Sequence, residues 1–284
     1  MDRRIEHVSA LTPRQRIEAV LDEGTFREIL GPFDGLESPH LPLVGLVPQS
    51  DDGAVIGRGT IDGVQAVVIG IDGRFQGGGI GEVSGAKVAG GLERALSERR
   101  QGRRCHVVLF VESGGIRLQE ANFGLLAISE IHAALVGLAV LGPVVAVVAG
   151  PVGCFGGMSI AVGLATHIIM TKLGRLGLNG PEVIEREAGV EELDSSDKPL
   201  IWAITGGAQR HSVALADELV DDDVEKLTAA IRETLVRPRS EGSRAVWSDP
   251  AARTLILDAA AVTEQVSPTG FRQSVARVRE GEQQ

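Results

Sequence analysis

Two pairs of adjacent glycines carry the clearest chemical signal in the sequence. Gly114-Gly115 follows the apolar run CHVVLFV, and Gly156-Gly157 follows the apolar run VVAVVAG. A helical pattern begins after each pair, so each pair stands where free backbone N–H groups gather at a helix N-terminus. Such groups bind negatively charged oxygen, and glycine lets a ligand come close because it has no Cβ. Two such turns on neighbouring strands could donate two hydrogen bonds to one oxygen.

Each pair could instead be only a tight turn between a strand and a helix, and a single pair would favour that simpler interpretation. The nearby side chains offer less chemistry. Ser113 precedes the first pair, but His132, on the helix that follows, lies roughly three turns further on, a poor position for a base. Cys154 is expected to be a small buried residue. Lys87 and Lys172 show no pattern that distinguishes them from surface lysines.

Arg117 lies two residues beyond the first pair and is the candidate cation of the region. Its guanidinium could hold a carboxylate or a phosphate group. It could equally form a surface ion pair with Glu120 or Glu93. A glycine-rich loop that contains Gly78 and Gly79 could also pass close to a substrate chain.

The elements that must position these residues alternate between strands and helices. Two apolar, β-branched runs joined by Asp62-Gly63 predict a hairpin. Further patterns predict strands at 106–111, 144–148 and 167–171, helices at 119–140 and 158–165, a short strand in RLGLNG and a helix that opens at Pro181. This order predicts an α/β fold with crossover connections.

The residue patterns at the two ends of the chain differ from the alternating strands and helices of the middle. Thr12, Pro13 and Gln15 carry the signature of a capped helix, and an irregular Pro- and Gly-rich arm follows it. Beyond Gly189 the pattern is mostly helical, most clearly at 217–236. The sequence therefore predicts three parts: an N-terminal helix and extended arm (1–52), a central domain (53–236), and a linker, short helix and tail (237–284).

Composition narrows the function. A formal net charge of −10 argues against a nucleic-acid binder and means that an anionic substrate needs local donors. The two cysteines lack metal-ligand spacing, so no metal site is expected. Charges or glycine–proline breaks are expected to keep every apolar run below membrane-spanning length, and the N-terminus lacks the apolar core of a signal peptide. A cytoplasmic protein is expected.

Four motifs in order connect these observations to a known family. FQGGGIGEVSGAK, SGGIRLQEA, GCFGGMSIA and LGLNGPEVIE together resemble the carboxyltransferase branch of the crotonase superfamily, over roughly Thr60 to Glu187. The resemblance implies a spiral β/β/α core and paired main-chain amides that stabilise a thioester enolate. It assigns that oxyanion hole to Gly114, Gly115, Gly156 and Gly157. It implies substrate contacts at Gly78, Gly79, Arg117, Asn179 and Gly180.

Departures from the pattern narrow the branch. The carboxylase β subunits carry a four-cysteine zinc ribbon that this chain lacks, and Glu182 stands where they have a basic residue. The arm GPFDGLESPHLPLVGLVPQSDDG and the segment Glu191–Arg210 resemble the β subunits of malonate decarboxylases. That resemblance implies decarboxylation of a malonyl thioester carried by an acyl-carrier subunit.

The same resemblance implies partners and cofactors. The partners would be a second crotonase-like (γ-type) subunit, the acyl-carrier subunit and a carrier-transferase subunit. This chain would bind no cofactor and no biotin, and the carrier would deliver a phosphoribosyl-dephospho-CoA arm. Two alternatives stay open: a zinc-free carboxyltransferase β subunit of a biotin-dependent carboxylase, and a mainly structural assembly subunit whose partner holds the catalytic site.

Overall fold

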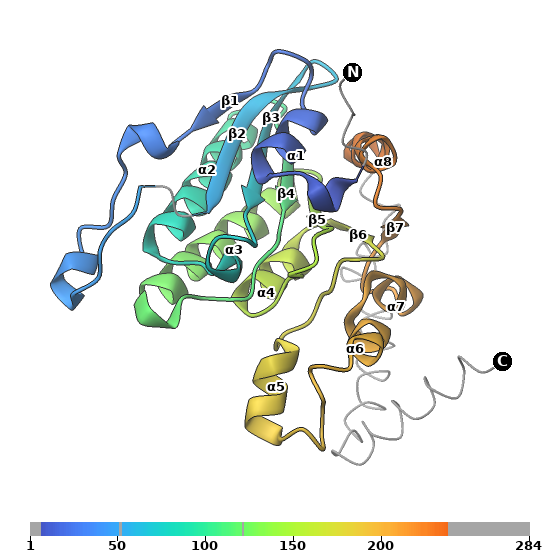
Figure 1. The fold of residues 1–284 in the computed structure, drawn as a ribbon. Coiled ribbons are helices and arrows are strands. Elements are labelled where there is room, and N and C mark those ends of the chain that lie inside the picture. The colour runs from blue at the N-terminus through green and yellow to red at the C-terminus, as the bar shows by residue number, and fades with distance from the viewer. Residues whose placement is uncertain (1–6, 51–52, 121, 238–284) are drawn as a thin grey trace, which may run out of the picture.

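A seven-stranded sheet organises the part of the molecule that the structure describes (Figure 1). The computed structural model describes residues 7–50, 53–120 and 122–237. The strands lie side by side in chain order: β1 (Arg27–Ile29), β2 (Ala54–Ile61), β3 (Val64–Ile71), β4 (His106–Phe110), β5 (Val144–Val148), β6 (His167–Thr171) and β7 (Glu218–Val220). The first three strands are antiparallel, and β3 to β7 run parallel.

The hairpin between β2 and β3 forms as the sequence predicts. Its turn places Asp62 at φ 49° and Gly63 at φ 74°, both in the left-handed region. An Asp-Gly pair suits a two-residue turn of this kind, because its twist matches that of the flanking strands. The hairpin sets the register of the sheet that the parallel strands then extend.

The parallel part of the sheet is a spiral. Successive right-handed crossovers between neighbouring strands leave their helices on one face, and these helices are α2 (Glu82–Arg100), α3 (Phe123–Leu141) and α4 (Gly157–Leu164). After β4, β5 and β6 the chain pairs again in isolated bridges, Ser113 with Cys154 and Cys154 with Leu176. Each repeat therefore contains a strand, a second short pairing segment and a helix, which confirms the predicted β/β/α core.

The sheet has a hydrophobic core on each face. One core lies between the sheet and α2, α3 and α4, and the other lies under α1 (Pro13–Val20) and α8 (Val224–Val236). Figure 1 shows α1 in front of the strands and α2 to α4 behind them. The strands are consequently buried on both sides. Near-continuous apolar runs such as HVVLF in β4 and VVAVV in β5 are typical of strands with this burial.

Helix α3 corrects one expectation. It has 19 residues with a mean hydropathy of 2.0 in its most apolar window, so by length and composition alone it could cross a membrane. Its only Asp, Glu, Lys or Arg residue is Glu130. In the fold it packs against α2 and α4 and buries Ile131, Leu135 and Leu138 in the core. The helix therefore belongs to the back layer of the sheet.

The N-terminal arm contains more regular structure than the sequence predicts. The predicted cap of α1 forms, with the Thr12 side chain accepting from Gln15 N. The arm is not wholly irregular, because β1 pairs with β2, and short 3₁₀ turns follow at Pro32–Asp34 and Leu41–Val44.

The C-terminal region begins with α5 (Pro181–Ala188), α6 (Lys198–Thr205) and α7 (Gly207–Ser212). The expectation of a continuous helix over 217–236 is wrong, because β7 joins the sheet first and α8 begins at Val224. RLGLNG forms bridges instead of a full strand. The predicted linker, short helix and tail lie outside the described residues except for Arg237.

Candidate active site

The loops that carry the two glycine pairs lie against each other. A Cβ atom on Gly156 would stand 2.9 Å from the Cα atom of Gly115. Ser113 N donates to Gly153 O at 2.8 Å, and Phe155 N donates to Ser113 O at 2.8 Å. Gly115 has φ 123° and Gly156 has φ 62°, values that L side chains rarely adopt. The structure therefore brings together the two pairs that the sequence singled out.

One amide of each pair is already engaged in holding the loops. Gly114 N donates to Gly77 O at 2.8 Å, which ties the first pair to the glycine-rich loop. Gly156 N donates to Leu178 O at 2.7 Å, which ties the second pair to the segment before α5. These two amides act as structural donors.

The other amide of each pair is more available. Gly115 N has one longer hydrogen bond, to Ser113 Oγ at 3.2 Å. Gly157 N opens α4, and within the described ranges it donates no hydrogen bond. The first N–H groups of a helix have no partner inside the helix, and the helix dipole favours negative charge there. The hydrogen bonds thus divide the four glycines. The amides of Gly114 and Gly156 fasten the loops, whereas within the described ranges the amides of Gly115 and Gly157 have no backbone acceptor.

The glycine-rich loop packs directly on the first pair. Gly78 has φ 68°, and a Cβ there would overlap the carbonyl oxygen of Glu112. A Cβ on Gly79 would lie 2.9 Å from Cγ of Arg117. Both positions therefore need glycine for close packing, whatever else they contact.

Arg117 forms the ion pair with Glu120 that the sequence allowed, but not on the surface. Arg117 Nη1 lies 3.0 Å from Glu120 Oε1, and both side chains are buried. The guanidinium also lies 5.2 Å from the centre of the Phe75 ring. Glu120 Oε2 accepts a hydrogen bond from Glu82 N at 2.7 Å. The pair thus joins the first loop to the start of α2.

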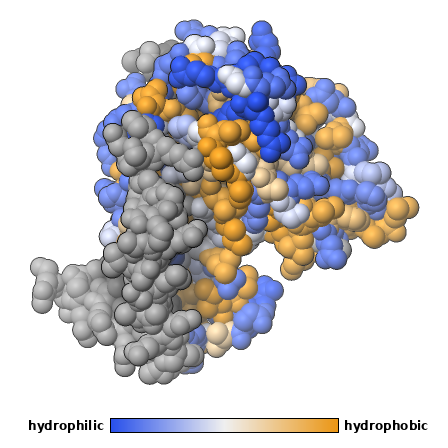
Figure 2. Space-filling view, turned by 180° about the vertical axis from the view of Figure 1, so that it is seen from behind, coloured by the Kyte–Doolittle hydropathy of each residue, from blue (hydrophilic) through white to orange (hydrophobic). Residues whose placement is uncertain are grey.

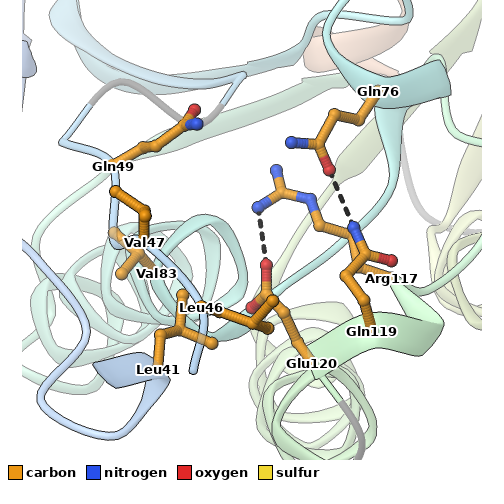
Figure 3. A pocket seen from close by; sticks show the side chains of 9 residues that line it. All are labelled: Leu41, Leu46, Val47, Gln49, Gln76, Val83, Arg117, Gln119 and Glu120. Atoms are coloured by element: carbon orange, nitrogen blue, oxygen red, sulfur yellow. Dashed lines mark hydrogen bonds and ion pairs between the residues drawn. The ribbon is translucent and has the colours of Figure 1, made fainter. Parts of the chain in front are cut away.

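A pocket of about 260 Å³ opens beside Arg117 (Figure 3). The arm forms one wall with Leu41, Leu46, Val47 and Gln49, and Val83 of α2 lies beside Val47. The opposite wall consists of Gln76, Arg117, Gln119 and Glu120. Gln119 Nε2 donates to Gln76 Oε1 at 3.0 Å, so the polar wall is held in place. The pocket combines an apolar wall with amide and guanidinium groups.

Asn179 and Gly180 lie on the approach to the second pair. They follow Leu178, whose carbonyl oxygen is bonded to Gly156 N. The Asn179 side chain is exposed, and Gly180 is the N-cap residue of α5. The structure therefore places them next to the second loop.

His132 is a functional candidate that sequence reasoning dismissed. Its Nε2 lies 2.9 Å from the carbonyl oxygen of Gly157, so the ring donates to the first residue of α4. From the sequence, His132 could be judged only by how far it lies from the first glycine pair along the chain. The helices α3 and α4 pack together, which brings His132 to the second pair.

Burial decides the interpretation of three further side chains, those of Lys87, Cys154 and Ser113. Lys87 was expected on the surface, and this expectation is wrong because Lys87 is completely buried in α2. Cys154 is buried as predicted, and burial raises the pKa of its thiol, which keeps the thiol neutral. Ser113 Oγ is fully buried and bonds to the Gly115 backbone. Neither Ser113 nor Cys154 is placed as an activated nucleophile.

The model of the carboxyl transferase domain matches residues 8–263. The chain belongs to this carboxyl transferase family. It is 41% identical over 240 residues to the malonyl-S-ACP:biotin-protein carboxyltransferase of Malonomonas rubra, covering 81% of this chain and 76% of that relative. This match and the family model confirm the resemblance seen in the four motifs.

Solved structures of carboxyl transferase relatives share the fold. A chain of a Pseudomonas malonate decarboxylase hetero-tetramer in complex with malonate is 52% identical, with a TM-score of 0.78, and the match covers 83% of this chain and 84% of that one. A chain of the Pseudomonas malonate decarboxylase MdcD-MdcE hetero-dimer is 46% identical, with a TM-score of 0.69 and coverage of 84% and 89%. These matches confirm the predicted crotonase-like carboxyltransferase fold.

Proposed function

We propose that this chain is the β subunit of a malonate decarboxylase, which converts a malonyl thioester on an acyl-carrier subunit into the acetyl thioester. The observation that carries the proposal is the meeting of two glycine loops. Within the described residues, each loop has one amide without a backbone acceptor, Gly115 N and Gly157 N. The similarity to chains of malonate decarboxylase structures supports the substrate class.

The chemistry needs a site that stabilises negative charge on one oxygen. When the bond between the malonyl Cα and its carboxylate breaks, carbon dioxide leaves and the electron pair moves onto the thioester oxygen as an enolate. Protonation of Cα then gives the acetyl thioester. A preorganised amide aimed at such an oxygen contributes roughly 10²–10³ in rate, or about 2.7–4 kcal/mol.

The pocket beside Arg117 suits the arm that carries the malonyl group. A pantetheine-like chain has both methylene and amide groups, and the pocket offers an apolar wall and the amides of Gln49, Gln76 and Gln119. Gly78 and Gly79 would line its path, and Arg117 would meet the substrate carboxylate or a phosphate of the arm. In this proposal the chain binds no cofactor itself, and the carrier supplies a phosphoribosyl-dephospho-CoA arm.

A second crotonase-like (γ-type) subunit is the proposed partner of the back layer. Figure 2 shows hydrophobic residues gathered in a band on the side of the molecule where α2, α3 and α4 lie. The exposed apolar residues on α3 and α4 include Leu125, Leu126, Val136, Val140 and Ile160. Exposed apolar surface of this kind marks protein interfaces. The acyl-carrier and carrier-transferase subunits would complete a cytoplasmic complex.

Transfer of the carboxyl group to biotin is a second candidate function. The Malonomonas rubra relative is named a malonyl-S-ACP:biotin-protein carboxyltransferase. The similarity of this chain to that relative supports transfer to biotin as an alternative. Both functions use the same enolate, so the acceptor of the carboxyl group distinguishes them. Avidin, which sequesters biotin, would stop transfer and leave direct decarboxylation unchanged.

The catalytic role is tested by replacing the Gly157 N–H in the assembled complex. Gly157 is the first residue of α4, a position whose backbone proline can adopt, so Gly157→Pro removes the donor with little change in the helix. Gly157→Ala is the matched control, because its Cβ meets the same Ile128 side chain but its N–H remains. Decarboxylation should fall roughly 10²–10³-fold in the proline variant relative to the alanine variant. Equal rates in two folded, assembled variants would instead support the assembly-subunit alternative.

A further inference from the structure

One buried carboxylate touches both glycine loops. Glu112 precedes the first pair along the chain, and its Oε1 accepts from Val152 N at 3.1 Å, in the loop that leads to the second pair. Its other oxygen, Oε2, lies 3.0 Å from Arg16 Nη1. Both charged side chains are buried.

Arg16 reaches the Glu112 carboxylate from the face of the sheet that α1 covers, opposite to the face covered by α2, α3 and α4. It belongs to α1, which packs on β2 and β3, and its Nε donates to Val8 O at 3.0 Å. The guanidinium thus links the N-terminal segment to Glu112, and through Glu112 to both loops. The link spans 96 residues of chain and forms without any contact to the pocket beside Arg117.

The surroundings of Glu112 leave room for its side chain alone. A Cβ on Gly150 would overlap the carboxylate, and a Cβ on Gly73 would lie 2.7 Å from Glu112 Cγ. Gly78 packs on the Glu112 carbonyl oxygen in the same way. Glycines from two segments therefore converge on this glutamate: Gly73 and Gly78 lie after β3, and Gly150 lies after β5. Gly73 and Gly150 confine its side chain.

A buried ion pair needs a reason beyond stability. Apolar residues of similar volume are often as stabilising as such a pair, whereas removing one partner leaves a costly buried charge. Here the pair fixes the orientation of the carboxylate, because one oxygen accepts a hydrogen bond from Arg16 and the other accepts one from Val152 N.

Resting on the proposed function, we propose that Glu112 and Arg16 are positioning residues that fix the separation of the two glycine loops. They act through Gly115 and Gly157 without touching the substrate. A shift of about 1 Å between two donors costs about 10²-fold in rate. Loosening the link should therefore lower kcat and leave the binding of the carrier arm intact.

The test uses Glu112→Gln, which keeps the shape and one oxygen acceptor for Val152 N but removes the charge. In the complete complex we expect kcat to fall roughly 10–100-fold, with KM for the malonyl carrier within about two-fold of the unmodified value. Hydrogen–deuterium exchange should rise selectively in peptides covering 113–117 and 150–158. Arg16→Gln should give the same pattern, and Arg16→Lys, which keeps the charge, should recover part of kcat.

Arg14→Gln is the matched control, because Arg14 lies on the same helix and pairs with Glu28 at 2.7 Å, away from the loops. It should leave kcat and loop exchange unchanged. A uniform rise in exchange across the sheet, with kcat following only the folded fraction, would overturn the proposal and leave the pair a structural one. If the unmodified complex did not decarboxylate its carrier but the loops still loosened selectively, the proposed function would fail while the positioning role stood.

Discussion

The Cα atom of Gly115 lies 2.9 Å from the point where a Cβ of Gly156 would stand. Two segments about forty residues apart thus touch through glycine backbones, with no side chain between them. The same point lies 3.9 Å from Gly115 N, so this amide of the first pair stands beside the second loop. It is the structural basis of the proposed oxyanion hole.

Gly156→Ala should damage both stability and activity. Gly156 has φ 62°, so a side chain there adds backbone strain of about 1–3 kcal/mol to the contact with Gly115. We expect a loss of that size in the free energy of unfolding, measured by urea denaturation. In the folded complex we expect kcat to fall by roughly ten-fold or more. Gly163→Ala in α4 is the control, since among the described residues nothing beyond its own stretch of helix lies within 4 Å of the added Cβ. An alanine variant at 156 as stable and active as the unmodified protein would refute the contact.

His132 should matter through the hydrogen bond it donates to Gly157 O. His132→Leu removes the donor, and we expect a loss of about 1 kcal/mol in stability, as for a typical hydrogen bond. We also expect a several-fold lower kcat, because the start of α4 is less firmly placed. His132→Gln retains a donor near the position of Nε2 and should preserve most of both quantities. If Leu and Gln gave the same kinetics, the bond would have no part in the reaction.

Filling the pocket beside Arg117 should block the carrier arm. Val47 lines the pocket from the arm, so a tryptophan there occupies space the pantetheine-like chain would need. We expect KM for the malonyl carrier to rise by about ten-fold or more in Val47→Trp, with kcat less affected. Leu43→Trp adds the same side chain to a residue of the arm that does not line the pocket, and its KM should not change. Equal KM values would place the substrate elsewhere.

Acid should weaken the link between the hairpin and α1. The hydrogen bond from the Thr60 hydroxyl, followed by that from Gly63 N, lowers the pKa of Asp22 to about 2. A depressed pKa contributes stability above the unfolded-state value of 3.8 and loses it as pH falls toward 2. The gap in the free energy of unfolding between the unmodified protein and Asp22→Asn should therefore narrow below about pH 4. A gap that stayed constant down to about pH 3 would contradict the assignment.

Features with a local physical cause could be predicted from the sequence. The Asp62-Gly63 turn, the Thr12 cap and the two glycine pairs each depend on a few consecutive residues, and each forms as expected. Short strands could not be predicted in this way. The three-residue strands β1 and β7 are set by pairing with β2 and β6, and their own sequences carry no strand pattern.

Features that depend on distant packing were missed for a common reason. Lys87 is buried and His132 reaches Gly157 because helices far apart in sequence pack together on one face of the sheet. The division of labour within each glycine pair also depends on acceptors elsewhere, Gly77 O and Leu178 O. A residue pattern identifies the pairs, but only the folded backbone shows which amide is already used.

The central claim concerns two amides, and one structure tests it most directly. The complete complex would be determined with a non-decarboxylating malonyl-thioester analogue on the acyl carrier. We predict the thioester oxygen about 2.7–3.1 Å from both Gly115 N and Gly157 N. A thioester oxygen held by the partner subunit, beyond about 4 Å from both amides, would contradict the account and move the catalytic hole out of this chain.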